Sequence, residues 1–171
     1  MTKAIVIDTN VLLVAEGLST FSGPCRDECK TLLQKVQQER VVVLDTGREI
    51  LKEYGNKLEH KKEPGMGHAF YRWLCQRVAT PAHCETVTLT AHPARKYAEF
   101  PDHSGLHKFD DSDRKFVAVA AAHPKKPEIV QAGDSKWWGW RQSLDECGIR
   151  LNMPCEAELR TKWEMKIGRH A

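Results

Sequence analysis

Four acidic residues stand where an apolar segment ends or where a helix would bury a side chain. Asp8 follows the run AIVI, Asp134 follows EIVQAG, Asp113 precedes RKFVAVAAA, and Glu53 lies within EILKEY. A carboxylate at such a position loses solvation free energy unless something binds it. Carboxylate oxygens are the ligands that hard divalent cations prefer, so several of them at strand ends predict a cation site.

Most of these acids also have a structural interpretation as helix caps. Asp8 and Asp134 each precede a helical segment, and aspartate is a favoured N-cap residue. Asp110 and Asp111 are better placed than Asp113 to cap the helix that begins in this region. Asp113 instead falls on a line with apolar residues, where a purely structural helix would carry leucine. We therefore treat Asp113 as a ligand.

Two neighbouring acids compete for the same roles. Taken alone, Glu53 would be a solvated surface glutamate. Glu49, one helical turn earlier, is the other candidate for the ligand position on this helix. Thr46 followed three residues later by Glu49 has the form of a capping box, so we assign Glu49 to the start of a helix and Glu53 to the cation site. Asp111 is the rival of Asp113, and the spacing of Asp113 to the small residues of FVAVAAA favours Asp113.

The order of the elements predicts an α/β fold. Short apolar strands are expected at 3–8, 41–44 and 128–132, with an edge strand at 149–151. Helices are expected at 25–40, 46–58, 67–79, 111–122, 135–147 and 156–167. This alternation predicts a three-layer α/β/α sandwich with a mostly parallel central sheet. Ligands of such sheets bind beyond the carboxyl ends of the strands, where Asp8 and Asp134 lie.

The chain has 171 residues and a net charge of +3, which suits one domain and is too mild to demonstrate a polyanionic partner. Residues 56–108 are the least regular and are expected to be an insertion over one end of the sheet, and residues 152–171 form a helical tail with Leu159, Trp163 and Ile167 on one stripe. No apolar run could span a bilayer, and we expect a cytoplasmic protein. The six cysteines are expected to be small buried hydrophobic residues, with structural zinc and disulfides as alternatives.

Taken in order, the acids have a familiar arrangement. IDTNVLL, EILKEY, DRKFVAVAAA and IVQAGDSKWW resemble the motifs of the PIN-domain nuclease family over residues 3–147, and residues 56–108 are the weakest part of the match. The resemblance implies that Asp8, Glu53, Asp113 and Asp134 bind Mg²⁺ or Mn²⁺. It also implies that Asn10 positions water or phosphate. The long middle insertion and the C-terminal tail depart from the family pattern.

The resemblance implies an endoribonuclease that cuts single-stranded or loop RNA, as the toxin of a toxin–antitoxin pair or as a defence effector. Expected partners are RNA, an antitoxin or other regulatory protein, and a second copy of the chain in a homodimer. Two alternatives remain: a structure-specific DNA nuclease, and a PIN-like scaffold that binds RNA or protein without cutting it. A scaffold would be expected to lack one or more of the acids, and all four are present.

Basic and aromatic residues near the acids are candidates for substrate binding. Arg48, Lys115 and Lys136 lie close in sequence to the proposed ligands and could contact the phosphates of a substrate, although each alone is most simply a surface residue. Three tryptophans follow the fourth acid within WWGW. We expect them mainly to pack in the core, and stacking of one on an unpaired base is the alternative.

Overall fold

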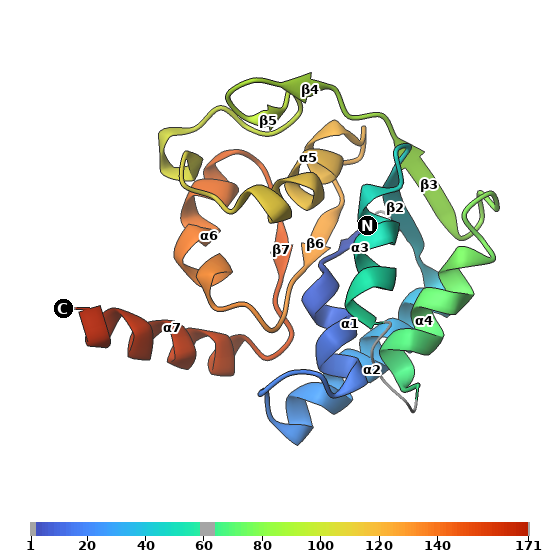
Figure 1. The fold of residues 1–171 in the computed structure, drawn as a ribbon, viewed down its shortest axis with the longest axis horizontal. Coiled ribbons are helices and arrows are strands. Elements are labelled where there is room, and N and C mark those ends of the chain that lie inside the picture. Colours follow the sequence, from blue (N-terminus) through green and yellow to red (C-terminus); the bar gives the residue numbers. More distant parts are fainter. Residues whose placement is uncertain (1–2, 59–63, 171) are drawn as a thin grey trace.

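The computed structural model describes residues 3–58 and 64–170, with side chains through residue 168. Its elements, in chain order, are β1 Ala4–Ile7, α1 Thr9–Glu16, α2 Gly23–Glu39, β2 Val41–Asp45, α3 Glu49–Leu58, α4 Met66–Cys75, β3 Cys84–Val87, β4 Ala91–His92, β5 Lys96–Tyr97, the 3₁₀ turns η1 Ser104–Leu106 and η2 Asp111–Asp113, α5 Arg114–Ala122, β6 Glu128–Val130, α6 Lys136–Glu146, β7 Leu151–Asn152 and α7 Glu156–His170. The expected α/β class is confirmed (Figure 1).

Five strands form one sheet in the order β3-β2-β1-β6-β7, and every neighbouring pair is parallel. The chain passes from β1 outward to β2 and β3, and then returns across the sheet to place β6 on the other side of β1. The direction of winding therefore reverses between β1 and β6. In open parallel sheets, this switch point is where loops diverge and leave a crevice at the carboxyl ends of the strands.

The helices cover the apolar strands. Helices α1 to α4 pack against one another, while α5 contacts β1, β2 and β6. The sequence FVAVA within α5 is buried along its whole length, as expected for a small-residue helix pressed on a sheet. Gly67 lets α4 approach α1 closely, because a Cβ there would lie 2.1 Å from the carbonyl oxygen of Leu12. A larger residue at this position would separate the two helices.

Part of the middle segment, which we expected to be an insertion over the sheet, belongs to the sheet itself. Residues 66–87 supply α4 and the edge strand β3, which pairs with β2 over the register Val42–Cys84 to Asp45–Val87. The sequence CETV is short, and only Cys84 is fully buried, so it lacks the apolar run by which the inner strands were found. The antiparallel pair β4–β5 and η1 form the part that lies over the end of the sheet (Figure 1).

The start of α3 is capped differently from our expectation. The side chain of Asp45, the last residue of β2, accepts hydrogen bonds from the backbone nitrogens of Glu49 at 2.8 Å and Ile50 at 3.0 Å. The hydroxyl of Thr46 instead lies 3.4 Å from that of Thr88. The proposed capping box of Thr46 and Glu49 is therefore wrong, because a better placed carboxylate already satisfies these two amide groups.

The cysteine expectation is wrong for one pair. Cys25 at the start of α2 and Cys155 before α7 form a disulfide across 130 residues of sequence. Cys29 and Cys84 are buried thiols, and burial raises the pKa of Cys29 to about 12. Cys75 is exposed. The disulfide could not be read from spacing, because only the return of the tail to α2 brings its two halves together.

The tail forms a helix, as expected, but its stripe is only partly buried. Leu159 is fully buried and Trp163 packs against Gly139 of α6, whereas Ile167 is 50% exposed. The C-terminal half of α7 extends away from the sheet (Figure 1). In the described ranges 3–58 and 64–170, no helix combines the length and apolar character needed to cross a membrane.

Candidate functional site

Asp8 lies at the switch point of the sheet and is fully buried. Its backbone nitrogen donates to the carbonyl oxygen of Val130 at 2.9 Å, which ties the end of β1 to the end of β6. Its Oδ2 atom accepts from the backbone and side-chain nitrogens of Asn10, both at 3.0 Å. Oδ1 is buried and has no hydrogen-bond partner among the described residues. One oxygen thus caps α1, and the other is left for a ligand.

Three more aspartates form a cluster, and the charges of two of them, Asp113 and Asp134, act on Asp8. Asp110 and Asp113 come from the turn before α5, and Asp134 comes from the loop after β6. One carboxylate oxygen from each lies within 4.8 Å of the other two. Asp113 precedes α5 without capping it through its side chain, so its carboxylate is available to the cluster.

The loop that carries Asp134 depends on a glycine. Gly133 has a φ of 86°, a left-handed conformation that favours glycine. A Cβ at this position would lie 3.0 Å from the Cβ of Asn10. Gly133 therefore allows the β6–α6 loop to pass close to the first turn of α1, which brings Asp134 toward Asp8.

Glu53 reaches the same region from α3. The hydroxyl of its neighbour Tyr54 is buried and donates to the carbonyl oxygen of Ile7, which fixes α3 over the end of β1. The Oε2 atom of Glu53 accepts from the hydroxyl of Thr9, and Oε1 lies 2.8 Å from the Nζ atom of Lys115. Both carboxylate oxygens thus have protein partners, unlike those of Asp8.

The crowding of like charges shows in the protonation of these groups. Burial, followed by the negative charges of Asp113 and Asp134, raises the pKa of Asp8 well above its usual range, against the opposing effect of Asn10. Burial, then Asp134, Glu53 and Asp110, raises the pKa of Asp113 to about 6, and Lys115 opposes the rise. Burial and the like charges nearby therefore both disfavour the charged forms of Asp8 and Asp113.

Of the four predicted acids, Asp113 and Asp134 share a cluster with Asp110, while Asp8 and Glu53 lie near enough for their charges to interact with Asp113. The three predicted cations have different surroundings. Lys115 pairs with Glu53, and Lys136 pairs with Asp110 at 3.1 Å. The hydrogen bond and charge of Asp110 raise the pKa of Lys136. Arg48 is exposed in the turn before α3, and its charge acts on the thiol of Cys84 in β3. It lies on the β3 side of the sheet, apart from the switch point.

Asp110 is the member of the cluster that the sequence argument assigned to capping. It stands before η2, yet its side chain makes no capping hydrogen bond there. Asp111 is 80% exposed on its side chain and lies 3.2 Å from the guanidinium of Arg114. The only sequence signal for Asp110 is the density of acids in DDSD, which gives no indication of which ones face inward.

The tryptophans divide as the packing interpretation predicted. Trp137 is fully buried, with its ring 5.2 Å from that of Phe109, and Trp140 lies 4.5 Å from the same ring. Trp138 is half-buried beneath the guanidinium of Arg141, at 3.9 Å. Two of the three tryptophans therefore support the loop and helix that carry Asp134.

The donor set fits a hard divalent cation. It consists of the carboxylate oxygens of Asp110, Asp113 and Asp134, and the unpartnered buried oxygen of Asp8 belongs to a carboxylate on which two of these acids act. Mg²⁺, Mn²⁺ and Ca²⁺ bind such ligands, whereas zinc prefers nitrogen and sulfur. Comparisons of the chain with protein-family models, with curated proteins and with solved structures each found no match.

Proposed function

We propose that the chain is a PIN-like, metal-dependent endoribonuclease that cuts single-stranded or loop RNA with Mg²⁺ or Mn²⁺. The observation that carries this proposal is the convergence of Asp8, Asp113 and Asp134 at the switch point, with a buried oxygen of Asp8 left without a protein partner. Leaving that oxygen unsatisfied costs free energy in the metal-free protein, and a bound cation would recover this cost.

The residues divide into ligands and supports. Asp8, Asp113 and Asp134 would hold the cation, with Asp110 beside them, while Asn10 keeps the carboxylate of Asp8 in place. A divalent ion at such a site would activate water and stabilise charge on the scissile phosphate. Glu53, held by Thr9 and Lys115, would act on the cation through a water or after releasing one of these partners.

The choice of RNA over DNA rests on the resemblance of IDTNVLL, EILKEY and IVQAGDSKWW to the PIN-domain family. The same resemblance supports a cytoplasmic toxin or defence effector, regulated by an antitoxin or similar partner and able to form a homodimer. These extensions of the proposal are separable from the chemistry of the site.

Cleavage of matched single-stranded RNA and DNA, with Mg²⁺, Mn²⁺ or EDTA, tests the proposal directly. We expect RNA to be cut in either metal and to stay intact in EDTA. Asp113→Asn should lower the rate about 100-fold or more, as removal of a group that stabilises transition-state charge does. Cleavage that persists in EDTA would contradict a metal-dependent mechanism, and cleavage of DNA alone would favour the alternative nuclease.

Asp111→Asn is the matched control, because it removes the same charge from the same 3₁₀ turn. Its side chain is 80% exposed and pairs with Arg114, away from the cluster. Only the Asp111 end of this pair is exposed, and the buried Arg114 keeps its hydrogen bonds to the carbonyl oxygens of Phe109 and His107. We therefore expect a loss of about 1 kcal/mol or less in stability and nearly full activity. If Asp111→Asn is inactive and Asp113→Asn is active, the ligand assignment in this turn is wrong.

A further inference from the structure

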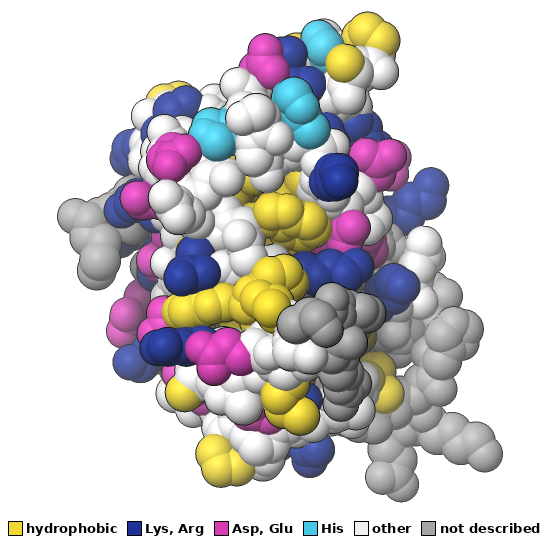
Figure 2. All heavy atoms as spheres, turned by 90° about the vertical axis from the view of Figure 1, so that its left-hand side faces the viewer, with side chains coloured by type: hydrophobic (Ala, Val, Ile, Leu, Met, Phe, Trp, Pro, Cys, Tyr) yellow, Lys and Arg dark blue, Asp and Glu magenta, His cyan; other side chains and the backbone are white. Residues whose placement is uncertain are grey.

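A small cleft opens directly beside Asp134, on the side where α7 crosses the loop between α1 and α2. It has a volume of about 330 Å³ and is lined by Thr20 and Phe21, by Gly133 to Ser135, and by Lys162, Met165 and Lys166 of α7. One wall thus belongs to the proposed cation site, and the facing wall carries two lysines. Figure 2 shows the side toward which α7 extends, where basic side chains border apolar ones.

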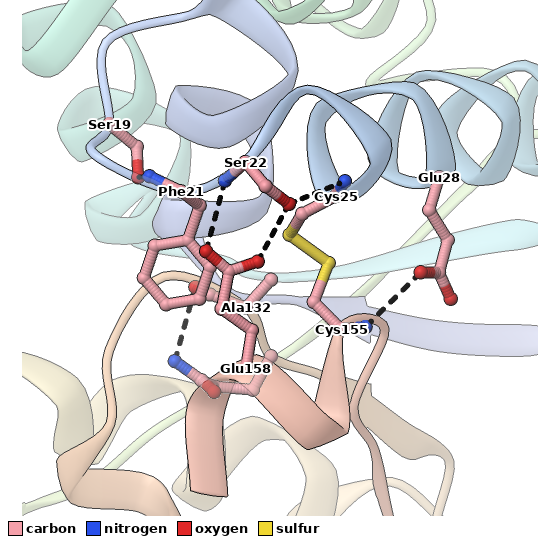
Figure 3. The surroundings of a disulfide bond; sticks show 9 residues. Ser19, Phe21, Ser22, Cys25, Glu28, Ala132, Cys155 and Glu158 are labelled. Carbon is pink, nitrogen blue, oxygen red and sulfur yellow. Dashed lines mark hydrogen bonds between the residues drawn. A yellow bond between two sulfur atoms is a disulfide. The ribbon is translucent and has the colours of Figure 1, made fainter. Parts of the chain in front are cut away.

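Helix α7 is fixed at its start, although its end extends away from the sheet. The disulfide joins Cys155 to Cys25, and the backbone nitrogen of Cys155 donates to Glu28 at 3.3 Å. Glu158 accepts from the backbone nitrogen of Ser22 at 3.0 Å and from its hydroxyl at 2.8 Å (Figure 3). These contacts hold the first turns of α7 against the N-terminus of α2, and they set the direction in which the helix leaves.

The lysines of this helix are not neutralised by the acids nearest to them in sequence. Glu158 lies one turn before Lys162 and is engaged by Ser22, while Glu164 lies 3.0 Å from Arg160. The Nζ atom of Lys162 is held over the ring of Phe21, at 4.5 Å, and lies 3.5 Å from the hydroxyl of Thr20. Its contacts are therefore with an aromatic face and a neutral hydroxyl, and its positive charge remains available at the cleft.

Lys166 follows Lys162 by four residues, so the two side chains share one face of α7. Two positive charges then line a path that begins at Asp134. A polynucleotide whose scissile phosphate sits at the carboxylates has its next phosphates within reach of such a path, and cations are needed there to offset their charge. An acidic peptide would bring its carboxylates next to Asp134 and repel it, and it has no scissile phosphate that would place it at the acids.

We propose that the cleft formed by Thr20, Phe21, Lys162 and Lys166 binds the phosphate backbone of single-stranded RNA next to the point of cleavage. This inference rests on the proposed function for the identity of the strand, and it assigns to α7 the role of a substrate-positioning helix. Lys162 and Lys166 contact the phosphates that flank the cut, while the acids act on the scissile phosphate. Their loss should raise KM and leave kcat nearly unchanged, because they do not touch the reacting atoms.

Binding can be measured separately from cleavage with a short fluorescein-labelled single-stranded oligoribonucleotide. The Asp8→Asn protein in Mg²⁺ serves as the background, and anisotropy is recorded with and without Lys162→Gln and Lys166→Gln. We expect the double lysine variant to bind about tenfold more weakly and the slope of log affinity against log salt to fall by about 1.4, the contribution of two phosphate contacts on a single strand. Lys35→Gln and Lys125→Gln form the matched control, because both lysines are exposed and line other clefts. An unchanged melting temperature verifies that each variant is folded.

Each outcome separates this inference from the nuclease proposal. Equal binding and equal KM in the Lys162 and Lys166 variant would overturn the cleft assignment and leave the nuclease proposal to its own test. If the otherwise unaltered chain fails to cut RNA but binding still depends on the two lysines, the nuclease proposal fails and the cleft stands. Displacement of the oligoribonucleotide by polyglutamate as efficiently as by unlabelled RNA would overturn the inference, since the cleft would then accept any polyanion.

Discussion

Asp8 follows β1 and Asp45 ends the neighbouring parallel strand β2. Both are buried and both are followed by threonine, yet they have different surroundings. Asp45 uses both carboxylate oxygens to receive the backbone nitrogens of Glu49 and Ile50. Asp8 uses one oxygen to receive Asn10 and leaves the other without a partner among the described residues. The first is a complete helix cap, and the second is a cap on one side only.

The difference follows from the topology of the sheet. Asp45 ends β2, which lies between β1 and β3, and the chain continues directly into α3 over the same strands. Asp8 follows β1, whose other neighbour, β6, comes from a later part of the chain and is followed by the loop that carries Asp134. A carboxylate at the switch point therefore meets acids from distant segments. Asp45 caps the helix that follows it and lies near Tyr97, whose pKa is raised by burial and then by the charge of Asp45. The position of each aspartate in the sheet, rather than its residue type, decides whether it can act as a cation ligand or only as a helix cap.

The largest expected effect comes from the same substitution at both positions. Asp8→Asn keeps a residue that can cap α1 but removes a charged ligand, so we expect RNA cleavage to fall by about 100-fold or more. Asp45→Asn should retain cleavage and lose about 1 kcal/mol of stability, because an amide has one acceptor for two amide hydrogens. Cleavage rates and urea unfolding of the two proteins give both quantities.

The two substitutions should also differ in their effect on stability, because only Asp45→Asn is expected to lower it. Relief of charge repulsion in Asp8→Asn is expected to leave the metal-free melting temperature unchanged or to raise it, as neutralising one of several crowded carboxylates does. A fully active Asp8→Asn protein would remove the distinction between the two aspartates and, with it, the site assignment.

Stabilisation by Mn²⁺ should also distinguish the capping aspartate Asp45 from the proposed ligand Asp134. Mn²⁺ that binds only the folded protein should stabilise it by about 2.7 kcal/mol at one hundred times the dissociation constant. This gain should persist in Asp45→Asn and disappear in Asp134→Asn, whose loop supplies a ligand on the β6 side. Melting curves with and without Mn²⁺ measure the shift. An equal shift in Asp134→Asn and the unaltered chain would place the bound ion elsewhere.

Much of the fold could be read from the sequence because its signals are local. The inner strands are apolar runs, and α5 has a small-residue face, so β1, β2 and β6 were found, together with Asp8 after β1 and Asp134 after β6. The short edge strand β3 was missed because CETV has no apolar run. Its pairing with β2 depends on the open edge of a sheet that has already formed.

The residues that make up the candidate site were harder to predict from the sequence. IVIDTN and VVLDTG look alike in sequence, and only the tertiary arrangement makes one aspartate a candidate ligand and the other a cap. The inward orientation of Asp110 and the pairing of Lys115 with Glu53 likewise depend on side-chain directions in a turn and between helices. Contacts across 62 residues of sequence, as in that ion pair, leave no periodic signal.

The smallest expected effect is the dependence of metal-free stability on pH. The pKa of Asp113 is raised from 3.8 to about 6 by burial and by Asp134, Glu53 and Asp110. Between these two values the folded protein binds more protons than the unfolded chain, so this group makes stability fall as the pH rises through that interval. Above about pH 6 the loss is complete, and below about pH 4 it is absent.

Asp113→Asn should therefore melt close to the unaltered chain at low pH and above it near neutral pH. A difference of about 1 kcal/mol corresponds to about 2–4 °C in a protein of this size. Melting curves of the two proteins in chelator-treated buffer across this range measure the effect, and a constant offset for Asp113→Asn at every pH would mean that Asp113 is not held among like charges.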